Sequence, residues 1–101
     1  MQTTSKKRPE ILEIEAAEGV LKSLSTLRAE LRRQSHPTDP ERIARLQSAL
    51  VEQMKAMSSV RGLMAKLQWE TIRLSEQEHE RLMELSRRLA AERRQIKKML
   101  R

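Results

Sequence analysis

Apolar residues recur every three or four positions along three stretches of this chain, and polar segments separate the stretches. Such spacing lines one face of an α-helix. The first stretch predicts a helix over 9–34, because Pro9 suits a first helical turn and acidic residues lead while basic residues close. Its apolar stripe includes Leu24, Leu27 and Leu31.

The clearest break in the pattern is Pro37-Thr38-Asp39-Pro40-Glu41, a helix stop followed by a helix start. Two caps remain open: Thr38 with Glu41 as a capping box, or Asp39 with Pro40 at the first helical position. A turn over 35–39, about five residues, folds the flanking helices back antiparallel. The second helix is predicted over 40–74. Its stripe is Ile43, Leu46, Leu50, Met57, Val60, Met64, Leu67 and Leu74.

A polar run over 75–81 precedes the third stripe. Either a third helix begins there, with Ser75 and Glu78 as a capping box, or one helix continues from Pro40 to the end. No proline or glycine enforces a break, so the pattern slightly favours a continuous or merely kinked helix. The third stripe is Leu82, Leu85, Leu89 and Ile96.

The predicted fold class is therefore all-α. It is an antiparallel helical hairpin or coiled coil with a long second arm or a third C-terminal helix, over 75–101. Residues 1–8 are expected to form a flexible basic arm, and 9–101 a single helical domain.

Composition agrees with thin helical packing. Aromatic content is 1%, and Trp69 is the sole aromatic residue, so aliphatic side chains must fill the seams between helices. There is no cysteine, which excludes disulfides. No 18-residue apolar run is present, so no membrane span is expected. The first thirty residues lack an apolar signal core, which predicts a cytoplasmic location.

Candidate chemistry is sparse. We find no catalytic motif, metal-ligand spacing or phosphate loop, and His36 and His79 show no ligand spacing. The sequence predicts a non-enzymatic protein without a cofactor. It would act through apolar seams on its helices, as an adaptor, a chaperone or a small assembly component. A homodimer or higher oligomer is expected, because one hairpin cannot bury both faces of a longer second arm.

The net charge of +7 favours acidic partners. Arg87, Arg94, Lys98 and Arg101 lie opposite the third apolar stripe, which gives the alternative function of nucleic-acid binding or regulation. These charges could also form only a solvated helix face. Trp69 lies off the main stripe, where it either anchors a partner or packs on another helix; packing is the favoured interpretation.

The segment Pro37-Thr38-Asp39-Pro40-Glu41-Arg42-Ile43-Ala44-Arg45-Leu46-Gln47-Ser48-Ala49-Leu50 resembles the inter-helix turn and second-helix start of type III secretion needle subunits. Small co-chaperones of that system are also helical hairpins. The resemblance covers residues 37–50. It implies a helical hairpin and a role as a secretion-system component.

Overall fold

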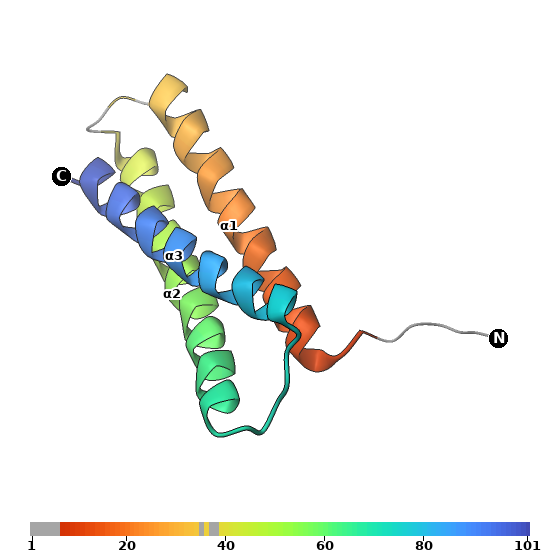
Figure 1. Ribbon diagram of the computed structural model, residues 1–101. Helices are drawn as coiled ribbons and strands as arrows, with labels where there is room; N and C mark the ends of the chain where they lie inside the picture. The colour runs from red at the N-terminus through yellow and green to blue at the C-terminus, as the bar shows by residue number, and fades with distance from the viewer. Residues whose placement is uncertain (1–6, 35, 37–38) are drawn as a thin grey trace.

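Three α-helices make up the computed structural model, which describes residues 7–34, 36 and 39–101. They are α1 (Pro9–Gln34), α2 (Pro40–Gln68) and α3 (Glu76–Met99). Each helix packs against the other two, so the chain forms a three-helix bundle (Figure 1). The predicted all-α class is confirmed.

Contacts between the helices fix their directions. The Arg42 side chain of α2 donates to the Leu31 carbonyl of α1 at 3.3 Å, close to the turn between them, as antiparallel packing requires. Arg81 pairs with Glu18 across 63 positions, and Arg28 with Glu92 across 64. This nearly constant offset means that α1 and α3 run parallel, with α2 antiparallel to both (Figure 1).

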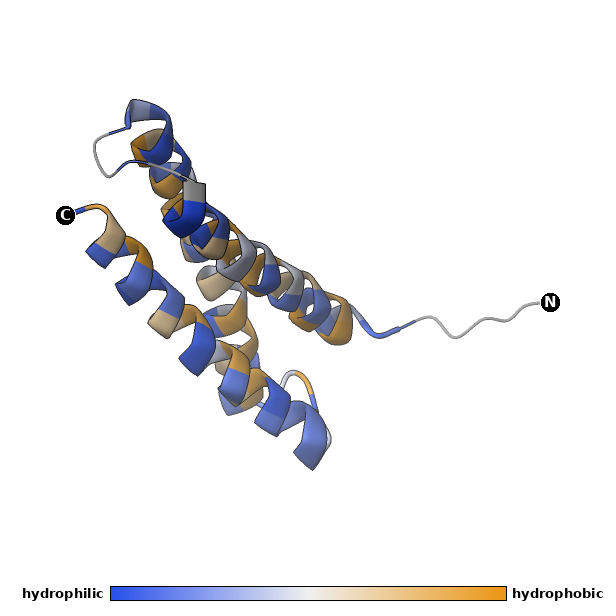
Figure 2. Cartoon of the chain, turned by 90° about the horizontal axis from the view of Figure 1, so that it is seen from above, coloured by the Kyte–Doolittle hydropathy of each residue, from blue (hydrophilic) through white to orange (hydrophobic). Residues whose placement is uncertain are grey.

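The core is a seam shared by all three helices. Figure 2 shows the apolar faces of α3 and of the α1/α2 pair turned toward one another. Ile14, Leu46, Leu82 and Leu89 are each 0% exposed. The third stripe thus covers the side of α2 that an isolated hairpin would leave open, and it buries that surface within the same chain.

The end of α2 corrects the sequence prediction. The helix stops at Gln68 rather than at 74, and the favoured continuous helix is wrong. Glu70 adopts a left-handed conformation, with φ of 58°. The Thr71 N–H then donates to the Lys66 carbonyl at 2.9 Å and the Glu70 N–H to the Leu67 carbonyl at 3.1 Å. This is the Schellman pattern that closes helices, here built without the usual glycine.

At the N-termini of α2 and α3, the side chain of the N-cap residue accepts a hydrogen bond from a backbone N–H of the first turn. Asp39 caps α2, because its carboxylate accepts from the Glu41 N–H at 3.0 Å and Pro40 occupies the first turn. Thr38, the other candidate cap, lies outside the described residues, as do Ser35 and Pro37 of the predicted turn. Ser75 and Glu78 form the reciprocal capping box of α3.

Of the predicted basic arm, only Lys7 and Arg8 are described. Lys7 pairs with Glu15 of α1 at 2.6 Å. Arg8 pairs with Glu78 of α3 at 2.6 Å and also donates to the Arg73 carbonyl at 2.9 Å. This part of the arm is therefore bound to the helices and to the α2–α3 connection.

Candidate functional site

A low-charge stripe runs along the solvent side of α2. At about 100° per residue, its members share an arc of roughly 100°, opposite the buried side of the helix. We call it the α2 outer face, and every member is exposed. It consists of Ile43, Gln47, Val51, Met54, Ser58, Gly62, Ala65 and Trp69.

Large apolar side chains are unusually open on this face. Val51 is 50% exposed and Met54 54% exposed. Ile43, which the sequence placed in the buried seam, is 37% exposed and belongs to the outer face instead. Its position on the arc explains the difference, because it lies about 60° from Leu46 around the helix.

Trp69 ends the α2 outer face and is 76% exposed. It is the C-cap residue of α2, immediately before the left-handed Glu70. The favoured interpretation, that this tryptophan packs on another helix, is wrong. The chain turns away at Glu70 before α3 can cover the indole, so a large apolar ring is left in water.

Charged side chains border the α2 outer face rather than crossing it, in a chain whose charged content is 35%. Arg61 lies at one edge of the arc, and Lys55 and Lys66 lie beyond the other. The apolar seam is the stronger pattern along this helix, so the sequence alone did not indicate the outer face. The signal available was the scarcity of charge at positions three or four apart from Ile43 to Trp69.

A second surface gathers cations where α1 and α3 both end. The Arg28–Glu92 ion pair joins these two helices about two turns before each of them ends. We call this surface the basic end, and none of its members forms an ion pair with a described residue. It comprises Arg32, Arg33, Arg93, Arg94, Lys97, Lys98 and Arg101.

Only part of the cationic stripe predicted from the sequence belongs to the basic end. Arg87, Arg94, Lys98 and Arg101 are all exposed. Arg87, however, lies upstream and pairs with Glu84 of its own helix. The other three belong to the basic end, to which α1 adds two arginines that the sequence did not indicate.

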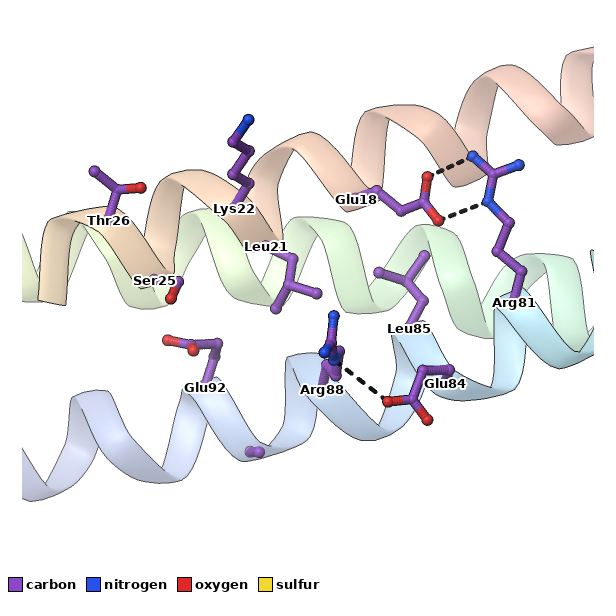
Figure 3. Close-up of a pocket in the computed structure, with 11 residues that line it drawn as sticks. Glu18, Leu21, Lys22, Ser25, Thr26, Arg81, Glu84, Leu85, Arg88 and Glu92 are labelled. Atoms are coloured by element: carbon purple, nitrogen blue, oxygen red, sulfur yellow. Dashed lines mark hydrogen bonds and ion pairs between the residues drawn. The ribbon is translucent and has the colours of Figure 1, made fainter. Parts of the chain in front are cut away.

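An open groove of about 660 Å³ separates α1 from α3. Leu21 and Leu85 point toward one another at its floor, and Arg81 reaches across it to Glu18 with a shortest contact of 2.5 Å (Figure 3). That carboxylate raises the pKa of Arg81 further above its ordinary value. Glu92 does the same for Arg28 at the other end of the groove. Both carboxylates therefore link α1 to α3 through ion pairs.

The remaining predicted seam residues lie at the helix interfaces. Leu82, Leu85, Leu89 and Ile96 are fully or almost fully buried inside this chain. This stripe is therefore not a surface on which a second copy of the chain could pack, because α1 and α2 already cover it. Other predicted seam positions are buried or half-buried: Leu24, Leu27, Leu31, Leu46, Leu50, Met57, Val60, Met64 and Leu67.

Within the described residues, no helix has both the length and the apolar character needed to cross a membrane. No group of three or more His, Asp or Glu side chains in this part of the chain could hold a metal ion. Comparisons with known protein families, curated proteins and solved structures found no match.

Proposed function

We propose that this protein is a non-enzymatic interaction module that binds a helix of a partner protein along the α2 outer face. The observation that carries the proposal is Trp69, 76% exposed at the end of a face with little charge. Tryptophan is enriched among residues that dominate binding energy, because its large ring loses much water-exposed area on docking. The buried stripes of the bundle are not available for this role.

The length of the α2 outer face supports a helical partner. From Val51 to Trp69 the stripe extends about 27 Å, at 1.5 Å per residue. A partner helix of about 20 residues would cover it in full. Exposed apolar residues at spacings of three, four and seven are the pattern on which one amphipathic helix docks against another.

Adaptor, chaperone and small assembly component all remain compatible with such a module. The secretion-system role implied by the sequence resemblance stays a prediction, as do a cytoplasmic location and self-association.

The test uses fluorescein-labelled synthetic helical peptides without tryptophan, which carry a leucine stripe flanked by glutamine. Anisotropy gives the dissociation constant, and the emission of Trp69 in the unlabelled mixture reports burial of the indole. We expect binding with a blue shift of that emission. Trp69→Ala should weaken binding about 30-fold, since such anchors typically contribute 2 kcal/mol or more.

A matched control keeps the test specific to this face. Arg94→Gln with Lys98→Gln changes exposed residues of the basic end and should leave the dissociation constant within about twofold. Circular dichroism checks that every variant keeps its helicity. Absence of peptide binding, or equal weakening by the control pair, would overturn the proposal.

A second candidate function is nucleic-acid binding at the basic end. The supporting observation is that unpaired cations of two parallel helices lie at the same end of the bundle, in a larger number than the helix dipole alone requires. Titration with labelled duplex DNA and single-stranded RNA over a range of salt tests it, because phosphate contacts give a steep loss of affinity with log salt. Affinity that hardly changes with salt, or that Arg94→Gln with Lys98→Gln does not weaken, would exclude this function.

A further inference from the structure

Between Val51 and Trp69, the charges nearest to the α2 outer face have the same sign on both edges. Arg61 stands at one edge and Lys55 and Lys66 at the other, and all three are exposed. Glu52, the acidic residue closest to these lysines along α2, lies further round the helix and contacts Lys55 at 3.9 Å. Arg61 and Lys66 have no ion-pair partner among the described residues. The apolar stripe is therefore framed by positive charge.

This frame disfavours a second copy of the chain as the occupant. Two helices packed through one face bring their edges together, and like charges across such an interface repel. In an antiparallel pair the Arg61 edges would meet each other, as would the lysine edges. In a parallel pair the Arg61 edge would meet the lysine edge. Each orientation therefore places cations against cations.

Small residues at the centre of the face define where a partner can come closest. Ser58, Gly62 and Ala65 lie between Met54 and Trp69, and a Cβ added at Gly62 would meet no atom within 4 Å. A bulky apolar side chain of the partner can therefore pack over these small residues, between Met54 and Trp69. Lys55, Arg61 and Lys66 surround it and would contact the flanks of the same partner helix.

From this geometry we infer that the occupant is an amphipathic helix of another protein, with acidic residues on both sides of its apolar stripe. The inference rests on the proposed function and adds the chemistry of the partner. Opposite charges on the flanks accelerate encounter and select orientation, while the apolar centre and Trp69 provide most of the affinity.

Three peptides with one leucine stripe and different flanks test the inference. Their flanking positions carry glutamate, glutamine or lysine. We expect the glutamate peptide to bind about tenfold more tightly than the glutamine peptide, with the lysine peptide weakest. The advantage of the glutamate peptide should shrink as salt rises, because exposed charges are screened.

Reversing the charges of Lys55, Arg61 and Lys66, the frame of the outer face, tests whether these residues cause the preference for glutamate. Lys55→Glu with Arg61→Glu and Lys66→Glu should make the lysine peptide the tightest ligand. The matched control, Arg94→Glu with Lys97→Glu and Lys98→Glu, changes the net charge equally and should retain the preference for glutamate. A triple change to glutamine at the frame serves as the second variant if the reversed chain loses helicity, and it should abolish the preference.

The outcomes separate this inference from the proposed function. Equal binding of all three peptides, with Trp69→Ala still weakening each, would overturn the acidic partner and keep the docking face. A reversal of preference by the control variant would assign the effect to net charge and overturn the inference. Sedimentation as a dimer that Trp69→Ala dissociates would show that a second copy is the occupant.

Discussion

Arg28 and Glu92 make a two-point contact between α1 and α3. The Arg28 Nε donates to one carboxylate oxygen at 2.6 Å, and Nη2 donates to the other at 2.8 Å. The two side chains are only 17% and 10% exposed. Paired N–H donors and carboxylate oxygens form one of the stronger polar contacts in proteins, so this one holds the parallel helices at a defined spacing.

Removing one member of that pair is expected to cost more than removing both. Arg28→Leu leaves the largely buried Glu92 carboxylate without its cation, and should lower the free energy of unfolding by about 2–3 kcal/mol. The double variant Arg28→Leu with Glu92→Leu should recover most of that loss, because two apolar side chains can pack in the same place. Urea unfolding followed by circular dichroism measures both. A double variant as unstable as the sum of the single changes would contradict this prediction.

The contact between Arg8 and Glu78 predicts a dependence of stability on pH. The Arg8 guanidinium lowers the pKa of Glu78 from its ordinary value, and the Ser75 N–H, which donates to the same carboxylate at 2.8 Å, acts in the same direction. A lowered folded-state pKa means that the carboxylate stabilises the fold above the ordinary value of about 4.3. That contribution disappears as pH falls through the folded-state pKa.

Arg8→Gln should therefore raise the pKa of Glu78, and it should reduce stability more at neutral pH than at a pH where Glu78 is protonated in both proteins. Carbon-detected NMR titration of the carboxyl groups measures the pKa directly. Lys7→Gln is the matched control, because Lys7 pairs with Glu15 and not with Glu78. A Glu78 pKa that the Arg8 change leaves in place would show that the arm does not hold this carboxylate in solution.

Glu70→Gly should stabilise the protein. Glu70 adopts a φ of 58°, which is unfavourable for a residue with a Cβ. Glycine removes that strain but gains freedom in the unfolded chain, so we expect a net gain of about 0.5–1 kcal/mol. The same substitution at Glu52, inside α2, should instead lower stability by about 1 kcal/mol. A loss of stability in both variants would argue against the left-handed turn.

Gln53 is a polar residue in the core, only 1% exposed. Its amide donates to the Leu89 carbonyl at 2.9 Å, while its own carbonyl oxygen accepts no hydrogen bond in the described part of the chain. Gln53→Met keeps the shape and removes the unsatisfied acceptor, so stability should stay equal or rise by about 1 kcal/mol. Gln53→Ala should cost about 2 kcal/mol or more through the cavity it leaves. Thermal unfolding distinguishes the two, and a Met variant as unstable as the Ala variant would show that the hydrogen bond dominates.

The sequence predicts much of this fold because its local signals agree with its packing. The bounds of α1 follow from Pro9 and the charge order, and the capping box of Ser75 and Glu78, which the sequence offered as the less favoured alternative, marks the start of α3. The stop of α2 could not be predicted in the same way. It depends on a glutamate in a left-handed conformation, which residue type alone does not favour, and on α3 folding back to bury Leu82 and Leu89.

The candidate surfaces were harder to predict for a related reason. The position of Trp69 on a helical wheel was clear, but its exposure depends on the direction in which the chain leaves α2. From the sequence, Arg32 and Arg33 are explained by the dipole of their own helix, and only the parallel packing of α1 and α3 places their end of the bundle together with that of Lys97 and Lys98. Both features come from contacts between segments far apart in the chain.

The ion pairs that join Arg8 and α1 to α3 also affect how long the folded molecule persists once it has formed. Arg8–Glu78, Glu18–Arg81 and Arg28–Glu92 join residues 63 to 70 positions apart. Contacts across each short connection can form before these distant ones, because less chain entropy is lost. We therefore expect the three ion pairs to form after the folding transition state, and interactions that form this late affect the unfolding rate rather than the folding rate. High salt or loss of these pairs should therefore shorten the lifetime of the native bundle while its refolding rate stays nearly constant.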